Sequence, residues 1–497
     1  MQAGAQLLGV PVKEACGVFG IYAPGTDVSH QTFDGIFALQ HRGQESAGMA
    51  VSDGETITVV KDTGLVASVF DDRTLHGLTG THAIGHTRYS TAGSQDWSSA
   101  QPVYRPIGPS GFTLAHNGNL TNAAVLNERV GVLPGMELTD SDTLAELIAT
   151  SFVGDRESEG SLCDALKAAL PLVEGAFSLT LLDATHVYGV RDPHGFRPLC
   201  LGRLGPVEAP TGWVLASESP ALDVIDAEFV REILPGEIVS IGADGVHSEF
   251  YVPEGNASEH LCIFEFVYFA RPDSLLRGRE VHGARRRMGE LLATQSPVEA
   301  DMVMGVPDSG VPAAEGFALA SGIAFGQGLV KNRYIGRTFI DPDQKARAKA
   351  VRRKLNPLKE NIEGKRLVVV DDSIVRGTTT RALVKMLKES GATEVHLRIS
   401  SPPFQWPCFY GIDTPTRGDL LAATHTLDEI VAYLGCDSLA YISLDNLRGA
   451  IGMVEGFCDA CLSGDYPTAV PVDLPRAKQR DAQIAADAEL QPALPGV

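Results

Sequence analysis

The sequence predicts two folds in succession: an α+β half built on antiparallel strands, then an α/β half built on a parallel sheet. In residues 16–255, short alternating apolar runs are separated by turns of small and polar residues, which is typical of antiparallel strands. In residues 256–470, strand-like runs alternate with helical segments, which is typical of a parallel sheet with its site at the carboxyl ends of the strands. At 497 residues the chain is too long for one core, so two or three domains are expected.

The composition argues against several classes of protein. The net charge of −21, from 41 basic and 62 acidic residues, disfavours a general nucleic-acid binder. No apolar run approaches the roughly 20 residues of a membrane span, and residues 1–15 lack the basic start and apolar middle of a secretory signal. We therefore expect a cytoplasmic protein without a membrane partner, whose eight cysteines stay reduced.

Four polar segments follow Cys16, which itself opens a strand-like run. They lie at residues 41–48, 85–91, 116–120 and 140–143. Taken alone, Cys16 is most simply a small buried residue, and Asn117-Gly118 is most simply a hairpin turn. The order of all the segments together carries more information than any one of them.

This order resembles the class II glutamine amidotransferases, which belong to the N-terminal-nucleophile (Ntn) hydrolases and share an αββα sandwich. The resemblance spans about residues 16 to 250, and it implies that Cys16 becomes the first residue of the mature chain. Residues 1–15 would then be a propeptide. An attacking cysteine acts as its thiolate, and a freed α-amino group titrates near about 8, so it can accept the thiol proton close to neutral pH.

The same resemblance implies roles for four further residues. Arg88 would bind the α-carboxylate of glutamine, for which its planar fork is suited, and Asp142 would meet the α-ammonium group. The side chain of Asn117 and the backbone N–H of Gly118 would form the oxyanion hole for the tetrahedral intermediate.

Residues 366–380 organise the C-terminal half. They predict a strand, an acidic turn at Asp371-Asp372, a small-residue loop and a helix. Gly377 lets an anion approach the backbone at the positive end of the helix dipole. The adjacent carboxylates suit a ribose diol, or Mg²⁺ that bridges to a pyrophosphate. A buried strand that ends in an ordinary acidic loop is the simpler alternative.

The whole stretch resembles the phosphoribosyl-pyrophosphate (PRPP) motif of the type I phosphoribosyltransferases. The resemblance implies that PRPP is bound by Asp371, Asp372, Ser373, Arg376, Gly377, Thr378 and Thr379. It implies that Mg²⁺ is held by Ser309, Asp371 and Asp372. In these families a mobile basic loop closes over PRPP, and here it would span about residues 334–349, with Arg337 and Lys345 at the pyrophosphate. A solvated helix face and a nucleic-acid arm are the alternatives for this basic segment.

Four cysteines admit several interpretations. Cys458 and Cys461 form a Cys-x-x-Cys pair, whereas Cys262 and Cys408 lie far away in sequence. By spacing alone, a zinc site, an iron–sulfur cluster and a redox pair without metal compete. One branch of the glutamine PRPP amidotransferases combines a cleaved leader with a 4Fe–4S cluster on four cysteines, so the resemblance implies one such cluster per subunit.

An amidotransferase followed by a phosphoribosyltransferase resembles the glutamine PRPP amidotransferase family over nearly the whole chain. The resemblance implies that ammonia from glutamine displaces pyrophosphate from PRPP and gives 5-phosphoribosylamine, at the first step of purine synthesis. It also implies a homotetramer that purine nucleotides inhibit; the composition of residues 471–497 separately indicates a loose tail. Three alternatives remain: an amidotransferase with another acceptor, a non-enzymatic nucleotide sensor, and an enzyme that uses only free ammonia.

Overall fold

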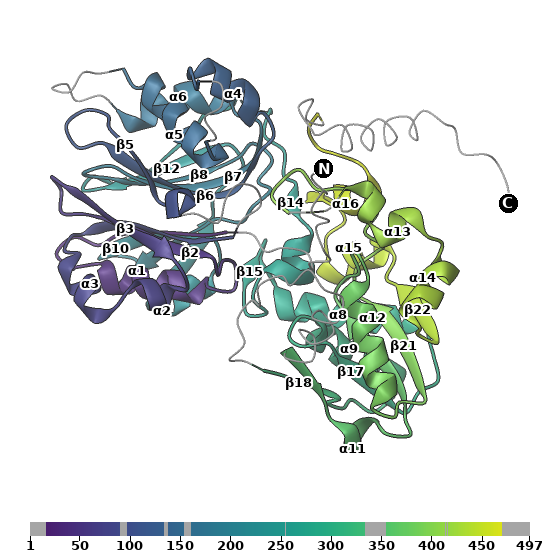
Figure 1. The fold of residues 1–497 in the computed structure, drawn as a ribbon. Helices are drawn as coiled ribbons and strands as arrows, with labels where there is room; N and C mark the ends of the chain where they lie inside the picture. The colour runs from purple at the N-terminus through teal and green to yellow at the C-terminus, as the bar shows by residue number, and fades with distance from the viewer. Residues whose placement is uncertain are drawn as a thin grey trace, which may run out of the picture.

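The computed structural model describes most of the chain as two domains (Figure 1). The described residues are 16–89, 97–133, 138–153, 161–253, 255–332, 354–412, 414 and 416–469. The predicted leader at 1–15, the loop residues Arg337 and Lys345, and the predicted tail at 471–497 therefore lie outside the described residues.

Two antiparallel sheets build the N-terminal domain. The first has the order β11 (Glu228–Glu232), β9 (Cys200–Leu204), β10 (Gly212–Ala216), β1 (Gly17–Tyr22), β4 (His82–Arg88), β2 (Ser46–Ser52) and β3 (Ile57–Thr63). The second has the order β13 (Gly245–Phe250), β12 (Glu237–Gly242), β8 (Val187–Arg191), β7 (Gly175–Leu182), β6 (Phe112–Leu120) and β5 (Val103–Arg105).

Helices cover the outer face of each sheet. The first sheet packs against α1 (Ser29–Ala38), α2 (Val66–Val69), α3 (Asp72–Gly77) and α7 (Pro220–Asp223). The second packs against α4 (Ala123–Arg129), α5 (Asp140–Ser151), α6 (Leu162–Ala169) and the short η2 (Leu170–Leu172). Alternation along β1 explains the layers: Phe19 and Ile21 face the helices, whereas Val18 and Tyr22 pack between the sheets. The predicted αββα sandwich is confirmed.

The C-terminal domain is built on a four-stranded parallel sheet. Its order is β17 (Met302–Gly305), β20 (Arg366–Asp371), β21 (Glu394–Ile399) and β22 (Ser438–Tyr441). One face packs on α8 (Val281–Gln295) and α9 (Gly310–Ser321), and the other on α12 (Thr378–Glu389) and α14 (Leu427–Leu434). Because both faces are covered, the interior of β20 is apolar: Val368 and Val370 face the first pair of helices, and Leu367 and Val369 face the second.

Shorter elements complete the two domains and the region between them. They are η1 (Trp97–Ser99), β14 (Leu261–Cys262), the π-helix η3 (Glu265–Phe269), β15 (Leu275–Leu276), β16 (Arg279–Glu280), β18 (Leu329–Lys331), β19 (Leu355–Pro357), α11 (Lys359–Ile362), η4 (Arg417–Asp419), α13 (Leu421–Thr424), α15 (Leu444–Ile451), β23 (Phe457–Cys458) and α16 (Ala460–Ser463). Figure 1 places β14 and β15 between the two domains. None of the helices in the described ranges combines the length and apolar character that crossing a bilayer requires.

Candidate active sites

Cys16 lies immediately before β1, beside the end of β4. Its thiol donates to the carbonyl oxygen of Tyr89 at 3.4 Å, and the N–H of Tyr89 donates to its sulfur at 3.3 Å. Burial raises the pKa of the Cys16 thiol, whereas the Tyr89 bond and the charges of Arg88 and Arg42 act to lower it. The side chain is therefore held in place, and the charges of two arginines act against the effect of burial on its pKa.

Asn117 and Gly118 lie in β6, paired with Ser178 and Phe177 of β7. The amide of Asn117 is fully buried, and within the described part of the chain neither its oxygen nor its nitrogen has a hydrogen-bond partner. Leaving a buried polar group unpaired costs about 1–3 kcal/mol, so an amide kept in this state suits a binding or catalytic role. At Gly118 a Cβ atom would lie 1.9 Å from the carbonyl oxygen of Ala176, so no side chain fits there.

Arg88 ends β4 and is 6% exposed. Its guanidinium lies 3.9 Å from the carboxylate of Glu45, and its charge acts on the Cys16 thiol. The structure thus brings together Cys16 and Arg88, two of the residues predicted for the glutaminase site.

Asp142 lies in the first turn of α5, and its contact with glutamine stays a prediction. Its carboxylate pairs with Arg105 at 3.1 Å and accepts the Thr139 hydroxyl at 2.7 Å, while its N–H donates to that hydroxyl at 3.1 Å. Asp140, two residues earlier, instead contributes to the electrostatic surroundings of Cys16, where its charge raises the thiol pKa. The carboxylate of Asp140 also accepts from the N–H groups of Leu120 at 3.2 Å and Ser141 at 2.8 Å, so both acids have local contacts.

The paired carboxylates of the second domain lie where β20 ends. Burial raises the pKa of both Asp371 and Asp372, and at Asp371 the charge of its neighbour adds to this. The hydroxyls of Ser309 and Ser373 both donate to Asp372, so the loops after β17 and β20 meet at this carboxylate. Two partly desolvated carboxylates side by side favour a bound cation, and their oxygen atoms suit Mg²⁺.

The loop after these carboxylates leads into the twelve-residue helix α12. Gly377 precedes the helix with φ of +71°, in the left-handed region that glycine adopts without strain. Thr378 and Thr379 form the first turn, where unpaired N–H groups and the helix dipole attract anions. The Nε atom of Arg376 is buried and has no partner among the described residues. These features suit a phosphate group, as the sequence predicts.

The basic segment begins and ends at a small antiparallel ladder, β18 with β19. The N–H of Asn332 donates to the carbonyl oxygen of Lys354 at 2.8 Å, so the two ends of the segment lie together. Lys331 pairs with Asp308, in the loop after β17. The segment therefore starts beside the carboxylate-bearing edge of the sheet, while the roles of Arg337 and Lys345 stay predictions.

The four cysteines predicted to act together are gathered by the fold. Cys262 and Cys458 lie opposite each other in the parallel pair β14–β23, and the N–H of Tyr410 donates to the sulfur of Cys408 at 3.4 Å. Burial raises the pKa of the Cys458 and Cys461 thiols, and the charges of the other cysteines raise it further. In the described ranges, no three His, Cys, Asp or Glu side chains are close enough together to hold a single metal ion.

The chain matches two family models in the order that the two domains suggest. Residues 86–224 match a glutamine amidotransferase domain, and residues 274–400 match a phosphoribosyl transferase domain. These matches fall on either side of the junction predicted near residue 255.

Curated relatives and solved structures cover nearly the whole chain. The amidophosphoribosyltransferase of Mycobacterium tuberculosis is 51% identical over 476 residues, which cover 92% of this chain and 87% of the relative. That of Bacillus subtilis is 44% identical over 479 residues, covering 94% and 98%. The B. subtilis enzyme solved with ADP and GMP superposes with a TM-score of 0.84 at 42% identity, over 93% of this chain and 100% of that one. The chain therefore belongs to the amidophosphoribosyltransferase family.

Proposed function

We propose that the two sites carry out the family's reaction in sequence, with ammonia from the first consumed at the second. The Cys16 thiolate attacks the side-chain amide carbon of glutamine, ammonia leaves, and water hydrolyses the resulting thioester to glutamate. Ammonia then forms a bond to C1 of PRPP while the bond to pyrophosphate breaks, which gives 5-phosphoribosylamine. This is the first step of purine biosynthesis.

At the glutaminase site, the unpaired amide of Asn117 supports the proposed oxyanion hole. A donor that is buried and already in place stabilises the charge that develops on the oxygen, without reorganisation during the reaction. We propose that Arg88 binds the α-carboxylate of glutamine and that an acid at the start of α5 binds the α-ammonium group, with Asp142 and Asp140 as the two candidates. Removal of residues 1–15 would free the α-amino group of Cys16 as the base.

At the second site, Asp371, Asp372 and Ser309 would hold Mg²⁺, and Gly377 with the first turn of α12 would bind the 5-phosphate. The meeting of the two loops at Asp372 and the raised pKa values of both carboxyl groups support a cation there. Mg²⁺, when bound, offsets the charge of the leaving pyrophosphate. We propose that Arg337 and Lys345 assist by closing over the same group.

The pairing of Cys262 with Cys458, and the effect of Cys408, Cys262 and Cys458 on the pKa of the Cys461 thiol, support a 4Fe–4S cluster. A cubane takes one thiolate on each of four irons, so its ligands stand farther apart than the ligands of one zinc. We propose Cys262, Cys408, Cys458 and Cys461 as these ligands. The reaction transfers no electrons, so the role of the cluster would be structural. It would link the start of the second domain to the last described segment of that domain. Iron and sulfide analysis of Cys458→Ser against the parent protein tests this, with Cys436→Ser as the control outside the set.

Regulation and assembly complete the proposal. A similar structure, the B. subtilis enzyme, was solved with ADP and GMP, which supports purine nucleotides as feedback inhibitors of this chain. We propose a homotetramer in the cytoplasm, to be checked by light scattering of the purified protein.

The buried amide of Asn117, unpaired among the described residues, carries the assignment, and one assay tests it. Pyrophosphate release from PRPP and Mg²⁺ is measured with glutamine or with ammonium at alkaline pH as the nitrogen donor. We expect release with both donors, and loss of only the glutamine-dependent reaction in Cys16→Ala. No release with either donor would overturn the assignment and favour a nucleotide sensor. Intact-mass analysis of the active protein checks the removal of residues 1–15.

A further inference from the structure

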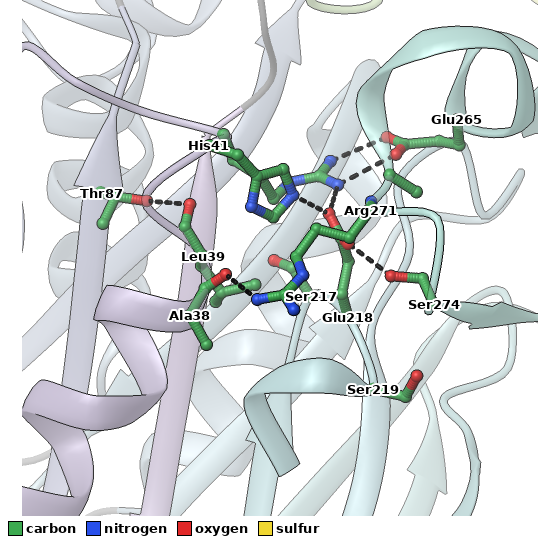
Figure 2. Close-up of polar contacts among 12 residues, drawn as sticks. Ala38, Leu39, His41, Thr87, Ser217, Glu218, Ser219, Glu265, Arg271 and Ser274 are labelled. Atoms are coloured by element: carbon green, nitrogen blue, oxygen red, sulfur yellow. Dashed lines mark hydrogen bonds and ion pairs between the residues drawn. The ribbon is translucent and has the colours of Figure 1, made fainter. Parts of the chain in front are cut away.

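A cluster of buried charges crosses the boundary between the two domains (Figure 2). Arg42, after α1, and Glu218, after β10, belong to the N-terminal domain, whereas Glu265 begins η3 in the C-terminal one. All three side chains are fully buried. Burying charges is unfavourable unless they are paired and fully hydrogen-bonded, so each contact in this cluster matters.

Arg42 connects the cluster to the nucleophile. Its Nε donates to the backbone carbonyl oxygen of Cys16 at 3.0 Å. Its two terminal nitrogens donate to the two carboxylate oxygens of Glu265 at 3.0 and 2.8 Å, and one of them also contacts Glu218. Because the guanidinium is planar, its two-point contact with Glu265 also fixes the direction in which its Nε–H points, toward the carbonyl of Cys16.

The C-terminal domain fixes the position of Glu265. Arg285 of α8 donates to the carbonyl oxygens of Phe266 and Ala270, both at 2.8 Å, and so braces the π-helix that Glu265 begins. The carboxylate of Glu265 also accepts from Arg197 at 3.2 Å, which balances the charges of the cluster.

Glu218 joins the cluster to the chain segment that enters the second domain. It pairs with His41 at 2.8 Å, and it accepts from the N–H of Arg271 at 2.9 Å and from the hydroxyl of Ser274 at 2.5 Å. Burial acts to raise the pKa of Glu218, but the neighbouring charges of His41 and Arg42 outweigh it and lower this pKa. Figure 2 shows these side chains converging from both domains.

Cys16 depends on this anchor because it lies outside the strand ladder. The strand β1 begins at Gly17, so Cys16 is held by the Tyr89 contacts to its sulfur and by Arg42 at its carbonyl. Once residues 1–15 are removed, as proposed above, no preceding peptide holds the residue. A terminal nucleophile then requires another restraint to keep its sulfur and its amine in register with the substrate.

We infer that Arg42 and Glu265 are positioning residues for Cys16, so that a carboxylate of the phosphoribosyltransferase domain completes the glutaminase site. The inference rests on the proposed function of Cys16. It makes the second domain a structural part of the first reaction, in addition to being the site where ammonia is used.

The test is Glu265→Gln in the full chain, which keeps the shape of the side chain and removes its charge. We expect the kcat of the glutamine-dependent reaction to fall about tenfold to a hundredfold, with the KM for glutamine within about twofold, because a misplaced nucleophile slows chemistry more than binding. The ammonium-dependent reaction should stay within about twofold. Alkylation of Cys16 by a glutamine-like diazoketone, followed by mass spectrometry, should slow in parallel with kcat.

Glu237→Gln is the matched control. Glu237 is equally buried and pairs with Arg231 at 2.8 and 2.6 Å, but its bonds lie within the N-terminal domain and away from Cys16. We expect this variant to lose stability and to keep the ratio of the two activities. Arg42→Lys weakens the same contact from the arginine side. It should show the loss of glutamine-dependent kcat expected for Glu265→Gln, and it replaces that variant as the test if Glu265→Gln does not fold.

Three results in Glu265→Gln and Arg42→Lys would overturn the inference. They are an unchanged glutamine-dependent kcat, an equal fall of the glutamine-dependent and ammonium-dependent activities, or an unchanged rate of Cys16 alkylation. Failure of the proposed function is distinguishable, because the parent protein would then release no pyrophosphate with either donor.

Discussion

At the residue scale, the side chains without partners are as informative as the bonded ones. Asn117 presents a buried amide whose two polar atoms have no partner among the described residues, in a strand that pairs with β7. A site that must bind a developing negative charge keeps such a donor free, and the folded protein bears its cost.

Asn117→Ala should therefore lower activity without lowering stability. We expect glutamine-dependent kcat to fall about 10²–10³-fold, as for the loss of one oxyanion-hole donor. The melting temperature should stay equal or rise, because the substitution removes an unpaired buried amide. Thr180→Val is the control: its hydroxyl, on the adjacent β7, is also buried and has no partner in the described part of the chain, and its loss should leave both activities unchanged. A large loss of stability in Asn117→Ala would show that the amide is structural.

Substitution of the two acids at the start of α5, Asp140 and Asp142, should have different effects on glutamine binding and on stability. Asp140→Asn is expected to raise the KM for glutamine about tenfold or more, because its charge lies in the surroundings of Cys16. Asp142→Asn should instead weaken the Arg105 contact and the helix start, with a stability loss of about 1 kcal/mol and a smaller change in KM. The reverse ranking of the two KM values would return the α-ammonium role to Asp142. Steady-state kinetics and thermal melts of both variants decide between them.

At the element scale, the regular structure was predictable and the contacts between distant elements were not. The strand β20 has a continuous apolar run and its loop a Gly and Thr pattern, so both the parallel sheet and the phosphate loop follow from local sequence. The pairing of β14 with β23 brings Cys262 beside Cys458, and no local pattern encodes it. Glu265 gave one signal, because a carboxylate inside an apolar run requires a buried partner, but only the fold identifies Arg42 as that partner.

The loop before α12 offers a test with a matched pair of glycines. Gly377 and Gly364 both have left-handed φ values, +71° and +74°, so alanine at either should cost about 1–2 kcal/mol. A Cβ at Gly364 would meet no described atom within 4 Å beyond its chain neighbours, whereas a Cβ at Gly377 would meet the Leu421 side chain at 2.5 Å. We expect both variants to melt earlier, and only Gly377→Ala to raise the KM for PRPP, about tenfold or more. An unchanged KM would remove this loop from the phosphate site.

At the scale of the whole molecule, the two chemistries belong to separate domains joined by a buried charged boundary. In the proposed reaction, ammonia must pass from the first site to the second, while each substrate binds on its own domain. Only the paired carboxylates are proposed to need Mg²⁺, whereas the glutaminase sulfur is not. Removing metal ions should therefore affect the second reaction and leave the first site reactive.

Chelation of Mg²⁺ should stop pyrophosphate release with both nitrogen donors and leave Cys16 reactive. Asp371 and Asp372 have raised pKa values and lie in the second domain, so loss of a cation there leaves adjacent carboxylates facing the charged pyrophosphate. The diazoketone should still alkylate Cys16 within about twofold of its normal rate, since that step uses the thiol and its neighbouring arginines. Added Mg²⁺ should restore release. Release that persists in chelator would remove the metal from these carboxylates, and an equal loss of alkylation would mean that the cation also acts on the first domain, through the boundary that Arg42 and Glu265 form.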